Sequence, residues 1–210
     1  MTPDAFVERF GQEKASAILR TDDADKAAQA MEAAIRGGFR IIEFTLTIPD
    51  VFDLVRDFSR REGLVVGTGT VMDAEQARQS VAAGARFLVS PVVDEAVIAA
   101  AKELGVASMP GTHTPTEMLR AHRAGAQLCK LFPCPHGGPA WVSSVLGPMP
   151  FLKIVPTNGV DHHNAGEWID AGAFAAGFVA TLFAPADMAA GRWDAIEERA
   201  RKCLAAVRGE

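Results

Sequence analysis

A chain of 210 residues that is 49 % apolar can bury a large core in one domain or two small ones. Its net charge of −5, without a basic stretch, argues against DNA or RNA as a partner. No apolar run approaches the roughly 20 residues that a membrane span needs, and residues 1–14 lack the apolar core of a signal peptide. Three cysteines without a CxxC pair favour a reducing compartment, so the composition predicts a cytoplasmic globular protein.

Short apolar runs recur along the chain about 23 residues apart, which indicates a structural repeat. Five of them follow a helix-like segment and a glycine, the residue that commonly ends a helix. Because the runs are apolar without alternation, they are typical of strands buried on both faces. The eight candidate strands lie within 16–20, 36–46, 64–70, 82–91, 103–111, 123–133, 151–159 and 170–180.

The segments between these runs carry helix signals, namely Asp or Thr caps at their starts and glycines at their ends. Helices are expected within 22–38, 73–84, 94–105 and 112–125, and an extra N-terminal helix within 1–15. An unbroken alternation of strands and helices predicts a parallel sheet, and eight units predict an α/β protein with a (β/α)₈ TIM barrel. We expect a single domain over residues 1–210. An open doubly wound sheet is the alternative, but no Gly-rich dinucleotide fingerprint follows the first strand.

In such barrels the chemistry lies at the carboxyl ends of the strands. Here these ends form a polar rim that contains one amine, one carboxyl and one guanidinium group. The rim residues singled out are Arg20, Glu43, Thr45, Thr47, Thr70, Ser90, Pro91, Thr112, Lys130, Phe132, Asn158, Gly159 and Thr181. They include no paired carboxylates at metal-ligand spacing and no Ser–His–Asp order, and the five histidines show no HExxH spacing. We therefore expect no metal site.

The run LCKLFP at 128–133 places Lys130 in an apolar strand, although lysine is rarely buried without a partner. Desolvation lowers the pKa of such an amine, and a neutral lysine can attack a ketone to form a Schiff base. Glu43, in IIEFTL, is the best candidate to move the protons. A structural ion pair between Lys130 and Glu43 is an equally open interpretation. Lys153 also stands three residues before a proline, so spacing does not choose between the two lysines.

Several motifs together resemble one family over essentially the whole chain, the 2-keto-3-deoxy-6-phosphogluconate / 4-hydroxy-2-oxoglutarate aldolases. They are EFTLTIP, VGTGTVMDAEQ, FLVSP, MPGTHTPTE, CKLFP, PTNGV and APAD. The resemblance implies a class I aldolase of carbohydrate metabolism, typically a homotrimer, that cleaves a 2-keto acid to pyruvate and an aldehyde without a cofactor. It implies that Lys130 forms the Schiff base, Glu43 is the general acid/base and Thr70 helps to bind the pyruvate carboxylate. The other residues expected to contact substrate are Arg20, Thr47, Pro91, Phe132, Asn158, Gly159 and Thr181.

Three departures from the family pattern bear on the substrate. Thr47 stands where many members have an arginine for the carboxylate, and Arg20 is a candidate to supply the charge instead, at either the carboxylate or the far end of the substrate. The glycines of the family's phosphate site are replaced in part, by Asn158–Gly159 and by residues 179–181. A substrate with or without phosphate is therefore open. Other functions also stay open: a phosphosugar lyase or isomerase in which Lys130 only binds an anion, a ligand-binding barrel without turnover, and a metal-dependent aldolase. The Gly/Pro-rich stretch 134–141 is expected to be a loop over the barrel mouth.

Overall fold

The computed structural model describes all 210 residues and contains one ring of eight parallel strands. They are β1 (Ala15–Leu19), β2 (Ile41–Thr45), β3 (Val65–Gly69), β4 (Phe87–Ser90), β5 (Ala107–Thr112), β6 (Cys129–Leu131), β7 (Ile154–Pro156) and β8 (Ala176–Phe178). The strands follow the order β7-β6-β5-β4-β3-β2-β1-β8. A parallel bridge between Thr157 and Gly177 joins the two outer strands and closes the ring. The predicted (β/α)₈ barrel is therefore confirmed.

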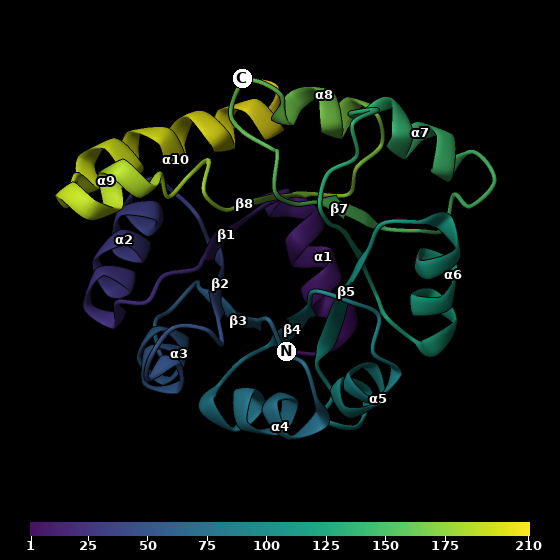
Figure 1. Ribbon diagram of the computed structural model, residues 1–210, viewed down its shortest axis with the longest axis horizontal. Helices are drawn as coiled ribbons and strands as arrows, with labels where there is room; N and C mark the ends of the chain where they lie inside the picture. The colour runs from purple at the N-terminus through teal and green to yellow at the C-terminus, as the bar shows by residue number, and fades with distance from the viewer.

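Helices surround this ring, and one further helix crosses its centre in projection (Figure 1). They are α1 (Pro3–Glu13), α2 (Ala24–Arg36), α3 (Val51–Ser59), α4 (Ala74–Ala83), α5 (Glu95–Glu103), α6 (Pro115–Ala124), α7 (Ala140–Leu146), α8 (Ala165–Asp170), α9 (Pro185–Ala190) and α10 (Trp193–Arg208). None of them combines the length and the apolar composition that crossing a bilayer requires.

The expected helices are present, with shorter ends. The helix expected from residue 112 begins at Pro115, because Thr112 is the last residue of β5 and Thr114 is the cap. The Thr114 side chain accepts from the Glu117 amide while Glu117 accepts from the Thr114 amide, so two otherwise unpaired N–H groups are satisfied. The loop expected over 134–141 ends earlier, because α7 begins at Ala140.

The N-terminal helix α1 plugs one end of the barrel. Phe6 and Phe10 are fully buried, and the Phe6 ring stacks on the Phe87 ring with centroids 4.6 Å apart. They belong to an apolar cluster with inward-facing residues of the strands. A side chain at Gly67 would place Cβ 2.4 Å from the Phe87 ring, so only glycine lets that ring cross the barrel interior. This end of the barrel interior is therefore filled by apolar side chains.

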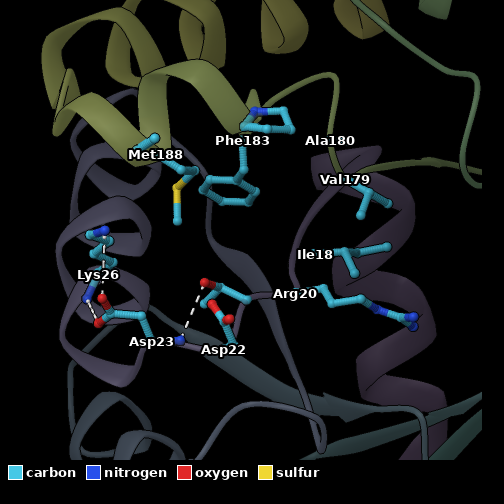
Figure 2. A pocket seen from close by; sticks show the side chains of 12 residues that line it. Ile18, Arg20, Asp22, Asp23, Lys26, Val179, Ala180, Phe183 and Met188 are labelled. Carbon is cyan, nitrogen blue, oxygen red and sulfur yellow. Dashed lines mark hydrogen bonds and ion pairs between the residues drawn. The ribbon is translucent and has the colours of Figure 1, made fainter.

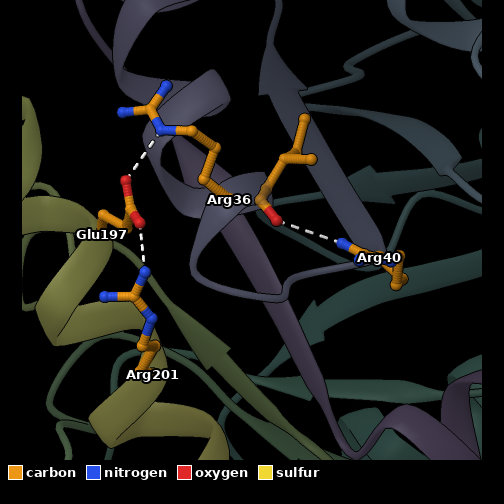
Figure 3. A network of polar contacts seen from close by, with 5 residues as sticks. Arg36, Arg40, Glu197 and Arg201 are labelled. Atoms are coloured by element: carbon orange, nitrogen blue, oxygen red, sulfur yellow. Dashed lines mark hydrogen bonds and ion pairs between the residues drawn. The ribbon is translucent and has the colours of Figure 1, made fainter.

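On the outside of the barrel, α10 packs against α2 beside β1 (Figure 3). Arg36 Nε donates to Glu197 Oε2 over 2.7 Å, and Arg201 pairs with the other oxygen of Glu197. Arg40 Nη1 donates to the Ile35 carbonyl oxygen over 3.1 Å, at the connection from α2 to β2. Such partly exposed pairs contribute little to stability, because water screens their charges. They orient the C-terminal helix next to the strand that carries Arg20 at its end.

Candidate active site

Lys130 and Glu43 face each other across the barrel interior. Glu43 lies on β2 and Lys130 on β6, four strands apart in a ring of eight. Glu43 is two residues after Ile41, and Lys130 is two residues after Leu128. Ile41 and Leu128 belong to the apolar cluster at the plugged end. Because alternate residues of a strand lie on the same face, Glu43 and Lys130 also point into the barrel. Glu43 is fully buried, and Lys130 is 8 % exposed. The interior therefore holds an amine and a carboxyl directly above the apolar plug.

The two groups do not form a close ion pair. No Lys130 nitrogen lies within 4.0 Å of a Glu43 oxygen, and both Glu43 oxygens are buried without a hydrogen-bond partner. A buried structural pair is expected to satisfy its polar atoms, because unpaired buried charges are costly. The geometry therefore does not match the structural interpretation that the sequence left open.

Burial moves both protonation equilibria toward the neutral forms. Burial raises the pKa of the Glu43 carboxyl, which the charges of Lys130 and Arg20 partly oppose. Burial also lowers the pKa of the Lys130 amine; the Glu43 charge opposes this shift, and the Arg20 charge adds to it. An amine that loses its proton more readily than usual is a nucleophile, and a carboxyl with a raised pKa can give and take protons.

Gly69 makes room for the Glu43 carboxyl. A Cβ atom at this position, at the end of β3, would lie 1.8 Å from Glu43 Oε1. Thr45 on β2 is the register partner of Gly69, so the glycine stands beside the strand that carries the carboxyl. Any side chain here would displace the Glu43 carboxyl from its place in the barrel.

Arg20 and Thr70 meet at the mouth of the barrel. Arg20 follows β1, and its Nη2 donates to Thr70 Oγ1 over 3.1 Å. Thr70 follows β3 and has φ +63°, in the left-handed region that a β-branched residue rarely adopts. Strained backbone of this kind tends to occur where a site requires a particular orientation. A guanidinium and a hydroxyl are thus held together above Glu43.

Three other predicted residues surround the same opening. The Phe132 ring centroid is 5.2 Å from Lys130 Nζ, within the range of a cation–π contact. The backbone of Pro91 lies close to Gly111, because a Cβ atom on Gly111 would be only 2.2 Å from the Pro91 carbonyl oxygen. Thr47 is exposed, and its hydroxyl shares a 2.8 Å hydrogen bond with the buried Thr45 hydroxyl. The structure places all three at the expected end of the barrel.

Asn158, Gly159 and Thr181 lie on the β7–β8 side of the opening. Asn158 and Gly159 follow β7 with φ +66° and +114°. The Thr181 hydroxyl donates to the Val160 carbonyl oxygen over 2.6 Å, which joins the loop after β8 to the loop after β7. This hydroxyl is therefore already bound within the protein.

Lys153, the other candidate lysine, is not at the opening. It precedes β7, and its carbonyl oxygen accepts from the Cys129 amide over 2.8 Å. Its position is at the plugged end of the strand, and its side chain is partly exposed. No group of three or more His, Cys, Asp and Glu side chains is arranged to hold a metal ion.

A pocket of about 400 Å³ opens beside this centre, between the β1–α2 connection and the segment from β8 to α9 (Figure 2). Arg20 and Ile18 form the wall toward the barrel, and Phe183 and Met188 form the outer wall. Of these four residues, only Arg20 is predicted from the sequence to contact substrate. The available signal was weak: Phe183 and Met188 are apolar residues after the last strand, which ordinary packing also explains.

Over residues 7–199 the sequence matches the protein family described as KDPG and KHG aldolase. It is 35 % identical over 193 residues to a probable 2-dehydro-3-deoxy-6-phosphogalactonate aldolase of Rhizobium meliloti, covering 90 % of this chain and 89 % of that one. It is 30 % identical over 204 residues to the 2-dehydro-3-deoxy-phosphogluconate aldolase of Pseudoalteromonas atlantica, covering 95 % and 94 %. A solved structure described as native KDPGal is 28 % identical with a TM-score of 0.82, covering 93 % and 94 %.

Proposed function

This chain belongs to the KDPG and KHG aldolase family, and we propose that it uses Lys130 as the Schiff-base nucleophile and Glu43 as the general acid/base. The observation that carries the assignment is the state of these two side chains. Both side chains are buried in the barrel interior. The pKa of Glu43 is raised by burial and that of Lys130 is lowered by burial, so both shifts favour the neutral forms. Neither Glu43 oxygen has a hydrogen-bond partner in the protein. Such an arrangement costs stability and is expected where chemistry requires it.

In the proposed reaction the neutral Lys130 amine attacks the C2 carbonyl of a 2-keto acid. Protons delivered through Glu43 allow the carbinolamine to lose water and become an iminium ion. Glu43 then takes the proton of the C4 hydroxyl, the C3–C4 bond breaks, and its electron pair moves into the iminium ion. An aldehyde leaves, and the remaining enamine is protonated at C3. Hydrolysis by water releases pyruvate and the free lysine, so atoms and charges balance without a metal or organic cofactor.

We assign the substrate carboxylate to Arg20 and Thr70. A guanidinium and a hydroxyl 3.1 Å apart suit the two oxygens of a carboxylate, and both belong to the rim above Glu43. Thr47 offers no charge at the position where an arginine is common in the family, so Arg20 supplies it. Pro91 and Phe132 then contact the pyruvate part, whereas Asn158, Gly159 and Thr181 face the part beyond C4.

We also propose that residues 1–210 act as one catalytic domain, that the chain forms a homotrimer and that it works in the cytoplasm. Met72 and Val92 are exposed large apolar residues just after β3 and β4, at the same end of neighbouring strands. A chain 27 % identical to this one belongs to a cage designed by fusing symmetric oligomeric domains. All three cysteines are free thiols, as a reducing compartment favours.

Borohydride trapping tests the chemistry directly. The protein is mixed with pyruvate and reduced, and the adduct is mapped by mass spectrometry in the wild type, Lys130→Met and the matched control Lys153→Met. We expect a pyruvate-derived adduct on Lys130 in the wild type and in the control, and none in Lys130→Met. An adduct on Lys153 alone, or no adduct at all, would contradict the proposal and favour a barrel in which Lys130 only binds an anion.

A further inference from the structure

We propose that the pocket between the β1–α2 connection and α9 binds the part of the substrate beyond C4, and that this part is an uncharged group with an apolar tail. The inference rests on the proposed aldolase function and adds the chemical class of the aldehyde.

The pocket starts at the reacting centre. Arg20 forms part of its wall, while the same guanidinium acts on the pKa of both Glu43 and Lys130. Ile18, another wall residue, is the register partner of Glu43 on the neighbouring strand. With the carboxylate at Arg20 and Thr70 and C2 at Lys130, we place the chain beyond C4 toward Val179 and Ala180, which follow β8 and line the pocket.

The outer wall of the pocket is apolar. Phe183 and Met188 lie side by side above it, and Val179 and Ile18 line its inner side (Figure 2). Its volume of about 400 Å³ is at the small end of ligand pockets, enough for a short chain or one ring. Burying an alkyl or aryl group against these side chains removes apolar surface from water, which favours binding.

The charged groups of the pocket are balanced or engaged elsewhere. Lys26 Nζ pairs with Asp23 Oδ2 at 3.7 Å, and the Arg20 guanidinium extends away from Phe183 and Met188 to bind Thr70. The Asp22 carboxylate has no hydrogen-bond or ion-pair partner (Figure 2). With Arg20 occupied by the substrate carboxylate, a phosphate in this pocket would meet the exposed Asp22 carboxylate, while the remaining cation, Lys26, is paired with Asp23. A neutral tail with a hydroxyl group for Asp22 fits these partners better.

The test is aldol addition of pyruvate to unbranched aldehydes from ethanal to pentanal, with glyceraldehyde 3-phosphate as the charged competitor. We expect kcat/KM to rise about fourfold for each added methylene until the pocket is filled, and pentanal to exceed the phosphorylated aldehyde. A flat series, or a preference for glyceraldehyde 3-phosphate, overturns the inference.

Two pairs of variants locate the effect in the pocket. Ala189 and Ala186 are exposed residues of α9, and only Ala189 lines the pocket. We expect Ala189→Glu to lower kcat/KM for pentanal at least tenfold, and Ala186→Glu to leave it unchanged. Asp22→Lys should raise kcat/KM for glyceraldehyde 3-phosphate about tenfold, whereas Asp25→Lys, on the exposed part of α2, should not. Equal effects within each pair contradict the inference.

Borohydride trapping with pyruvate separates this inference from the function on which it rests. A Lys130 adduct in every variant, together with the chain-length dependence, supports both. A Lys130 adduct without chain-length dependence contradicts only the assignment of the pocket. Absence of the adduct in the wild type contradicts the aldolase mechanism and the pocket assignment with it.

Discussion

The guanidinium of Arg20 and the hydroxyl of Thr70 are 3.1 Å apart, so the residues that follow β1 and β3 meet above β2, the strand that carries Glu43. The contact joins the arginine of the rim to a residue with a strained backbone, because Thr70 has φ +63°. An exposed arginine gains little from one neutral hydroxyl in water. The contact is better explained as a prepared site for an anion, which both groups can bind at once.

Thr70→Val tests this role while keeping the β-branched shape, so the backbone strain stays similar. We expect the KM for the 2-keto acid to rise about tenfold, which corresponds to the loss of about 1.4 kcal/mol, with a smaller change in kcat. Steady-state kinetics of cleavage measures both constants. The matched control is Thr116→Val, because Thr116 is an exposed threonine of α6 and is not one of the site residues. An equal rise in KM in the control would contradict a special role for Thr70.

Burial is the main cause of the lowered pKa of Lys130, and the charge of Arg20 should lower further the pH at which Lys130 becomes reactive. Arg20 lowers the pKa of Lys130, so its removal in Arg20→Gln lets that pKa return toward the usual lysine range. Because only the neutral amine attacks, the rise in the rate of Schiff-base formation with pH should move to higher pH. Trapping rates measured across a pH series with saturating pyruvate report this shift.

The matched variant for that experiment is Arg20→Lys, which keeps the positive charge and loses the two-pronged shape. Its pH profile should stay near that of the wild type, while its KM for pyruvate rises. A lower rate in Arg20→Gln with no displacement along the pH axis would show that Arg20 binds substrate without tuning Lys130.

Gly69→Ala should inactivate the enzyme through Glu43. The added Cβ would lie 1.8 Å from Glu43 Oε1, so the carboxyl has to leave its place. Loss of a positioned general acid/base typically costs 10²–10⁴-fold in rate, and we expect kcat to fall about a hundredfold or more. Gly147→Ala is the control, because its nearest atoms are 3.7 Å away. Wild-type kcat in folded Gly69→Ala protein would exclude Glu43 as the proton carrier.

The fold was predictable from sequence because the strands lie in regularly spaced apolar runs, and because helices such as α2, α4 and α6 lie between a capping Asp or Thr and a glycine. Lys130 and Glu43 could be found because charged residues inside such runs are exceptions that require a cause. The contact between Arg20 and Thr70 could not be found, since it depends on a left-handed residue fifty positions away along the chain. Phe183 and Met188 could not be predicted as pocket residues either, because an apolar residue that lines a pocket looks the same in the sequence as one in the core.

The buried pair should lower stability in exchange for activity. Burial disfavours the charged forms of both Glu43 and Lys130, and neither Glu43 oxygen is hydrogen bonded. Replacing such groups by apolar side chains of similar size is often stabilising. We expect Glu43→Met/Lys130→Met to raise the free energy of unfolding by about 1–3 kcal/mol at pH 7 and to abolish Schiff-base formation. Chemical denaturation followed by circular dichroism measures the first quantity.

The single variant Glu43→Met is the comparison that gives this measurement its meaning. It leaves the Lys130 amine without the carboxylate that favours its charged form, so it should be less stable than the double variant. A double variant less stable than the wild type would mean that the two residues hold the barrel together as a structural pair. A double variant more stable than both would mean that selection has kept a costly amine and carboxyl in the barrel for their chemistry.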